Sequence, residues 1–419
     1  MDNVTHTLIG LIVGESVAAE TPPSARGVPA GARRALVVAV AVIGSNTPDL
    51  DLLLSFGGGT AGHLDYMLRH RGYTHTVLGC LALALILYAC AEAWLRYRRI
   101  EPSRRDRGLL LAVAIFATAL HLVMDYLNSY GVHPFWPVEN RWSYGDSVFI
   151  VEPLYWVAAA PLLCSLRSRF ARLVFALALV AVVAVGALGR LLAPASCIVL
   201  AVAALALVFL GSRVSLRSAA RVAATLCLGV TLTFILAGHS AASRAEALAR
   251  DALPGDNLLD RVLSPLPANP LCWDLLLLET HGDRYVARHA VLTLAPDAVA
   301  ARECPMMVGA QEHTAPLAAV GAADTVRVRW LGEFEIVQQA LAQRVAASCD
   351  AQAFMLFARA PFLASEPSGA ETVLGDLRFD RGHERGSFEV PVPPMKKIPS
   401  CVRAAPWSAP RADLLGIRQ

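Results

Sequence analysis

Residues 109–128 read LLLAVAIFATALHLVMDYLN, an apolar run that is interrupted near its end by His121 and Asp125. About 20 apolar residues are enough for a helix to cross the ~30 Å hydrocarbon core of a membrane. The run therefore predicts a membrane-spanning helix. Because ionisable side chains are costly inside a membrane, His121 and Asp125 also mark a candidate functional site.

Other apolar runs lie on both sides of this one. The clear ones are Val77–Leu95, Arg172–Gly189, Leu191–Gly211 and Val222–Gly238, and the weaker ones are Val4–Ala19, Leu36–Leu54 and Val148–Leu166. The composition agrees, with 55% hydrophobic and only 17% charged residues, against about 25% charged in soluble domains. The sequence thus predicts an all-α polytopic membrane protein with seven or eight transmembrane helices. Val4–Ala19 lacks the basic start of a secretory signal, so we expect a retained helix that either spans or re-enters the membrane.

Arginines alternate between the loops of this topology. Segments 21–35, 96–108, 167–172 and 212–221 hold 15 arginines, whereas segments 55–76 and 129–152 hold 3. Arginine-rich loops stay in the cytoplasm, so eight spans place the N-terminus and everything after about residue 239 outside a bacterial inner membrane. A net charge of +3 is too small to predict a nucleic-acid partner.

The segment 241–419 has a different character, because charges return and prolines are frequent. Alternating apolar residues and short apolar runs favour strands at 284–293, 325–330, 353–359 and 386–392, and a helix at 333–347. We expect three regions: a metal-binding membrane domain at 1–165, additional transmembrane helices at 166–240, and a soluble extracytoplasmic α+β domain at 241–419. In the last region Cys272, Cys304, Cys349 and Cys401 allow two disulfides with three possible pairings.

Four polar clusters stand in the N-terminal half: NVTHT at 3–7, NTPDLD at 46–51, HRGYTH at 70–75 and HLVMD at 121–125. Each alone has an ordinary explanation as an interfacial anchor, a turn or a helix cap. Together they are more informative, because the topology inferred from the arginines brings all four to the outer face of the membrane. His121 and Asp125 are also four residues apart, so they share one face of their helix.

Histidine nitrogens and aspartate oxygens are the ligands of a divalent metal, with Zn²⁺ favoured and Mn²⁺ or Fe²⁺ as alternatives. The predicted ligands are His6, Asp49, Asp51, His70, His75, His121 and Asp125. They outnumber the four ligands of one tetrahedral zinc. They therefore predict either two metal ions or one ion with additional acid–base and supporting groups. His133, Glu139, Asp146 and Glu152 are further candidates, but they match no motif.

The order of these residues resembles the LexA-regulated, membrane-bound, metal-dependent hydrolase family, the YdjM family. That family is typed by an N-terminal His, a PDLD turn, an HRGxTHS loop and an HxxxD helix, and the resemblance covers about residues 1–165. Thr76 stands here where the family usually has Ser. The ligand order is more distantly similar to zinc-dependent phospholipase C and P1-type nucleases, whose later His-x3-Glu pair has no counterpart in this sequence.

The resemblance implies a hydrolase at the outer membrane face that cleaves a phosphoester of a lipid or lipid-linked substrate. Asp49 or Asp51 would then accept the proton of the attacking water, and Arg71 would neutralise the phosphate, unless it is an interfacial anchor. The alternative is a non-enzymatic envelope protein, with the metal as a structural clip and the C-terminal domain presented to an unknown partner. A transporter is disfavoured, because the ionisable residues crowd one face and one half of the chain.

Overall fold

The computed structural model describes residues 1–22, 27–54, 59–166, 168–189, 191–252, 255–306, 316–365, 372–380, 388–393, 401 and 404–415. The chain forms two compact units that are interleaved in sequence. The first comprises residues 1–50, 73–136 and 148–235, and the second comprises residues 51–72, 137–147 and 236–419. The three functional regions predicted at 1–165, 166–240 and 241–419 stay predictions.

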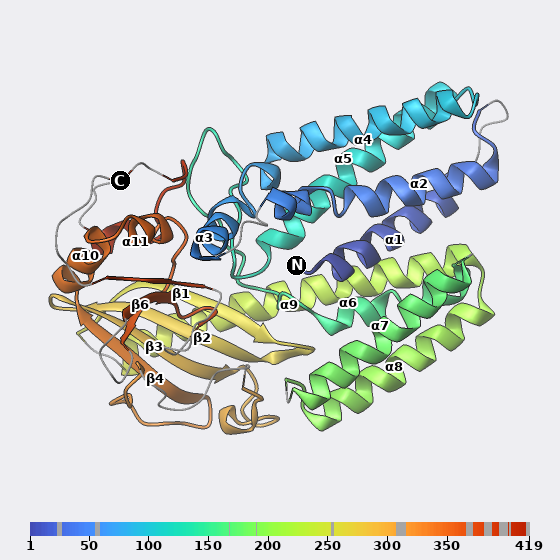
Figure 1. Cartoon of the computed structure of the whole chain (residues 1–419). Coiled ribbons are helices and arrows are strands. Elements are labelled where there is room, and N and C mark those ends of the chain that lie inside the picture. Colours follow the sequence, from blue (N-terminus) through green and yellow to red (C-terminus); the bar gives the residue numbers. More distant parts are fainter. Residues whose placement is uncertain are drawn as a thin grey trace. The chain divides into compact units, whose positions relative to one another are not determined.

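The first unit is built of helices (Figure 1). They are α1 (Asn3–Glu20), α2 (Ala30–Gly44), α4 (Val77–Tyr97), α5 (Arg104–Tyr126), α6 (Pro153–Ala158), α7 (Arg169–Leu188), α8 (Pro194–Arg213) and the first part of α9 (Leu216–Ala252). Five of them, α4, α5, α7, α8 and α9, are long and apolar enough to cross a membrane. These five coincide with the five clear apolar runs of the sequence. The total of seven or eight spans is not confirmed.

The three weaker runs behave differently from the clear ones. α1 covers the first of them, with 18 residues. α2 has 15 residues, about 22 Å of helix against ~30 Å of hydrocarbon, and the PDLD turn that follows it is a 3₁₀ helix, Pro48–Leu54. The run 148–166 forms no continuous helix: α6 has six residues and is followed by the 3₁₀ helix Ala160–Ser165 with Pro161 in its first turn. Proline lacks the N–H that a continuing helix needs, which accounts for the change at this point.

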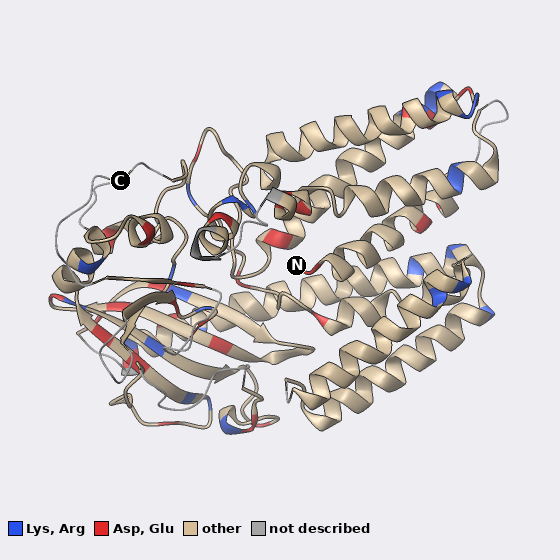
Figure 2. Ribbon diagram, viewed as in Figure 1, with Lys and Arg blue, Asp and Glu red and all other residues tan. Residues whose placement is uncertain are grey.

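Two apolar cores hold these helices together. One joins α2, α4 and α5 through residues such as Val37, Leu87 and Val113. The other joins α1, α6, α7 and α9 through residues such as Ile12 and Phe175. Figure 2 shows that the basic residues of this unit gather at one end of the helices, where α4 meets α5 and where α2, α7 and α9 begin. These are the loops that the sequence predicts to be cytoplasmic.

The second unit contains the antiparallel sheets of the α+β domain predicted at 241–419, and it adds residues 51–72 and 137–147, which that prediction did not include. A four-stranded antiparallel sheet has the order β1 (Asn257–Leu266), β2 (Asn269–His281), β3 (Arg284–Thr293) and β4 (Val328–Val337). A three-stranded sheet contains β5 (Pro361–Ser365), β6 (Thr372–Asp376) and β7 (Glu389–Pro391). The helices are α3 (Gly59–Arg69), α10 (Gln338–Ala346), α11 (Cys349–Phe354) and the end of α9. Ala241, Ala245 and Ala249 of α9 pack on Trp273, Leu275 and Leu277 of the larger sheet.

Strand predictions in this unit had mixed outcomes. β3 has the predicted bounds, whereas β4 continues to Val337 and shortens the predicted helix to α10. The strand predicted at 353–359 is wrong, because α11 occupies its start. Ser348 caps α11, with its hydroxyl accepting from the Ala351 N–H. Periodicity alone does not distinguish a helix from a strand in a short apolar run, and the cap favours the helix. β7 lies inside the strand predicted at 386–392, of which residues 386 and 387 are outside the described residues.

Two disulfides cross-link the second unit and resolve the open pairing: Cys272–Cys304 and Cys349–Cys401. The other five cysteines are free. We therefore expect a thiol-alkylating reagent to label five of the nine cysteines of the unfolded, unreduced protein and all nine after reduction. Peptide mass spectrometry would identify the linked pairs. Nine labelled cysteines before reduction would contradict both the bridges and an oxidising compartment for this domain.

Candidate metal centre

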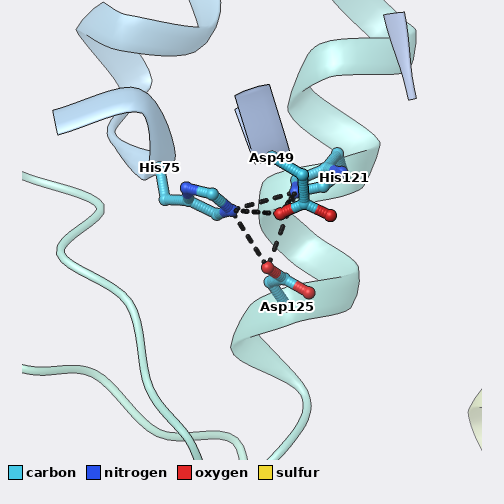
Figure 3. A group of neighbouring side chains, drawn as sticks. All are labelled: Asp49, His75, His121 and Asp125. Carbon is cyan, nitrogen blue, oxygen red and sulfur yellow. Dashed lines mark hydrogen bonds and ion pairs between the residues drawn. The ribbon is translucent and has the colours of Figure 1, made fainter. Parts of the chain in front are cut away.

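Four buried side chains of the first unit converge on one point (Figure 3). Asp49 lies on the 3₁₀ helix of the PDLD turn, and His75 ends the 3₁₀ turn Tyr73–His75. His121 and Asp125 lie near the end of α5. At most 7% of the surface of any of these residues is exposed. Each offers one ligand atom, and the four atoms lie within 4.8 Å of one another.

The spacing of these atoms fits one small cation. Nε2 of His75 lies 3.2 Å from Oδ1 of Asp49, 3.1 Å from Oδ2 of Asp125 and 3.0 Å from Nε2 of His121. Nε2 of His121 lies 3.5 Å from each of the same two oxygens. Four tetrahedral ligands at about 2.0–2.1 Å from an ion would be about 3.3–3.4 Å apart. The observed edges scatter around that value.

The chemistry of the donor set points the same way. Nδ1 of His121 lies 2.7 Å from the carbonyl oxygen of Ser45. A carbonyl only accepts, so Nδ1 carries the proton, and a neutral His121 turns the lone pair of Nε2 toward the cluster. The two carboxylate oxygens also present lone pairs. A cation is the partner that satisfies such converging acceptors, so the residues present fit a divalent metal.

Local sequence explains how each ligand is placed. The i, i+4 spacing puts His121 and Asp125 one turn apart on α5. His75 lies just before Thr76, the N-cap of α4, whose hydroxyl accepts from the Gly79 N–H at 2.8 Å. Serine and threonine are both good caps, so the departure from the family's usual serine keeps this function. The four ligands lie at the ends of the helices remote from the arginine-rich loops.

Three further groups surround the four ligands. Nε2 of His6 lies 3.2 Å from Oδ1 of Asp125, and its ring stacks on His121 with the centroids 3.8 Å apart. The amino group of Met1 pairs with the same oxygen of Asp125. The amide of Asn3 donates to Oδ2 of Asp49 at 2.8 Å. His6 is therefore adjacent to the centre, but it contacts the oxygen of Asp125 that faces away from the four-atom group.

Asn3 was not among the predicted site residues. The available signal was its spacing, because Asn3 lies three residues before His6 and so on the same face of α1.

The remaining predicted site residues belong to the second unit. Nδ1 of His70 lies 2.9 Å from Oδ1 of Asp51, and the backbone N–H of Arg71 donates to Oδ2 of Asp51 at 3.1 Å. All three are buried. Their participation in metal binding or catalysis stays a prediction.

Two of the candidates without a motif have structural partners instead. Asp146 pairs with Arg359 at 2.8 Å. Glu152 is the N-cap of α6 and accepts from the Leu154 N–H at 3.0 Å.

Residues 1–193 match the family model described as YdjM inner membrane protein. This match confirms the resemblance to the YdjM family, and together with the five apolar helices it supports a membrane protein. The metal-dependent hydrolase activity and the similarity to phospholipase C and P1-type nucleases stay predictions. No curated protein and no solved structure matches the chain.

Proposed function

We propose that this protein is a metal-dependent hydrolase of the bacterial inner membrane, with its site at the outer face. The observation that carries the proposal is the buried centre of Asp49, His75, His121 and Asp125, whose four ligand atoms lie within 4.8 Å of one another. Its substrate would be a phosphoester of a lipid or lipid-linked molecule, because the centre belongs to a helical membrane unit.

These four residues would hold the ion, most simply Zn²⁺, with Mn²⁺ and Fe²⁺ as alternatives. His6, Asp51 and His70 are the proposed further ligands, which a second ion would require. A bound divalent ion lowers the pKa of water and stabilises the charge of a phosphoryl group.

The side chains of the chain would supply the remaining chemistry. Asp49 or Asp51 would accept a proton from the attacking water. Arg71 carries a permanent positive charge and would bind the phosphate oxygens. Ser45 orients His121 through its carbonyl, and Asn3 orients Asp49. Such hydrogen bonds to metal ligands fix their tautomer and direction.

Topology is part of the proposal. The arginine-rich ends of the helices would face the cytoplasm, which leaves the ligand-bearing ends at the outer face. The two disulfides support an extracytoplasmic second unit, since such bonds persist in oxidising compartments.

A turnover assay tests the activity. Detergent-purified protein would be supplied in turn with Zn²⁺, Mn²⁺ and Fe²⁺ and assayed with bis(p-nitrophenyl) phosphate, then with phospholipid vesicles. We expect hydrolysis that a chelator removes and added metal restores. Arg71→Ala should lower turnover about 10–100-fold, and Arg71→Lys should lower it less, because lysine keeps the charge but loses the paired donors. Absence of turnover by metal-loaded wild type on both substrates would exclude a phosphoesterase.

One observation favours a second candidate, a structural metal clip in a non-enzymatic envelope protein. Four protein ligands close a tetrahedral shell, and structural zinc sites are closed, whereas catalytic sites keep one position open. Asp49→Ala separates the two candidates. A catalytic centre predicts folded, inactive protein in the membrane, and a structural clip predicts loss of the folded protein.

A further inference from the structure

The HRG turn, His70–Gly72, lies within the family-matched region but folds with the second unit. We propose that the C-terminal segment Ala404–Leu415 is the element that positions this turn, and that Trp407 is its anchor. The C-terminal segment would then fix the turn that carries Arg71, within the second unit. The consequence for turnover rests on the proposed hydrolase function, whereas the positioning itself does not.

Trp407 is fully buried, and two contacts connect it to the turn. Its indole N–H donates to the carbonyl oxygen of Leu68 at 2.7 Å, across 339 residues of sequence. A Cβ atom added to Gly72 would lie 2.9 Å from Cζ2 of Trp407, so the indole ring packs directly against the backbone of the turn. Only glycine leaves room for that approach.

Trp407 is itself firmly held. The backbone N–H of Ser408 donates to the carbonyl oxygen of Asn140 at 2.9 Å. Cys401, just before the segment, is bonded to Cys349 at the start of α11, and α11 packs against α3, the helix that leads into the turn. The segment is thus fastened at Ser408 to the loop 137–147 and, through the disulfide, to α11, which packs against α3.

The turn has a conformation that needs such support. Arg71 has φ of 60°, in the left-handed region that non-glycine residues seldom adopt. Strain of this kind persists only where the surroundings fix it, and it is concentrated at functional sites. Asp51 provides part of the restraint through His70 and the Arg71 N–H. Tyr66 of α3 adds to it, stacking on His70 with the centroids 5.0 Å apart.

Amide hydrogen exchange of the full-length protein tests the positioning. Trp407→Phe keeps the ring but loses the hydrogen bond to Leu68, so exchange in a peptide covering residues 63–73 should be about fivefold faster. Trp273→Phe is the matched control, because the buried Trp273 loses a similar bond, to the carbonyl of Pro270 at 2.9 Å, without touching the turn. Unchanged exchange at 63–73 in Trp407→Phe, or equal acceleration in both variants, would overturn the proposal.

A reciprocal variant covers the case in which Trp407→Phe does not fold. Gly72→Ala places a methyl group 2.8 Å from the carbonyl oxygen of Arg69 and 2.9 Å from Cζ2 of Trp407. The turn and Trp407 must then move apart, so a peptide covering residues 404–415 should exchange several-fold faster. No change there would also overturn the proposal.

A double-mutant cycle on bis(p-nitrophenyl) phosphate tests the functional consequence. Trp407→Phe should lower turnover about fivefold in wild type and less than twofold in an Arg71→Ala background, because both changes act through the same turn. Equal losses in the two backgrounds would show that Trp407 acts elsewhere. If wild type has no turnover, the proposed function fails, but the exchange result still decides the positioning.

Discussion

Alanine at His121 or Asp125 is expected to remove the bound metal. Elemental analysis of the detergent-purified variant should then find a metal content no higher than background. Each change deletes one of four converging ligand atoms, and a shell of three buried ligands loses far more than the 10–100-fold in affinity typical of changes to supporting residues. Turnover should fall by about 10³-fold or more, because the chemistry depends on the ion.

His239→Ala is the matched control, since His239 is an exposed histidine on α9 and should retain the metal. Metal retained in both His121→Ala and Asp125→Ala would contradict the centre. A folded wild-type protein whose metal content does not exceed background would also contradict the metal centre.

The number of metal ions bound per wild-type chain shows whether Asp51 and His70 bind a second ion. About one equivalent, unchanged in Asp51→Asn, would confine the metal to the four-residue centre. Two equivalents that fall to one in Asp51→Asn would assign the pair Asp51–His70 to a second ion.

The sequence predicted the parts of this molecule that are governed by short-range rules. The five clear apolar runs needed only length and hydropathy. The pair His121–Asp125 needed only helical periodicity. Both inferences rest on a local pattern that tertiary packing did not alter. The arginine-derived topology, from which the gathering of the polar clusters at one face was predicted, stays a prediction.

Long-range contacts account for what could not be predicted. The disulfide pairing depends on how the sheets fold, and no spacing rule selects Cys272–Cys304. The run 353–359 is a different case, because the signal for its helical start, the cap at Ser348, is local and stands in the sequence. The chain leading into the HRG turn accepts a hydrogen bond at Leu68 from Trp407, more than 300 residues away. Nothing within the turn indicates that partner.

Arg359 illustrates the same point with the largest expected effect on stability. Its guanidinium donates to both carboxylate oxygens of Asp146 at 2.8 Å and to those of Asp260 at 2.9 and 3.1 Å. Its Cζ atom lies 3.9 Å from the centre of the Tyr144 ring. Only 4% of the residue is exposed. Arg359 therefore joins the loop 137–147 to β1 of the larger sheet.

Arg359→Met should lower the free energy of unfolding by about 3 kcal/mol, because a buried guanidinium is removed from Asp146 and Asp260, whose partly buried carboxylates then lose their main partner. For a domain of this size that corresponds to a drop of about 10 °C in the melting temperature in detergent, measurable by tryptophan fluorescence. Arg327→Met, at an exposed arginine, should change little. Equal melting temperatures for the two variants would show that the ion pairs of Arg359 contribute nothing to the stability of the domain.

The pH dependence identifies the cause of that loss. Burial raises the pKa of Asp260, but Arg359 and Arg411 outweigh burial and lower it. A carboxyl whose folded-state pKa is lowered stabilises the fold above its unfolded pKa, and this contribution is lost as the pH falls through the folded value. The difference in melting temperature between wild type and Arg359→Met should therefore narrow on acidification. If the difference in melting temperature stays constant down to the pH of acid unfolding, Arg359 stabilises the domain by packing on Tyr144 rather than by neutralising Asp260.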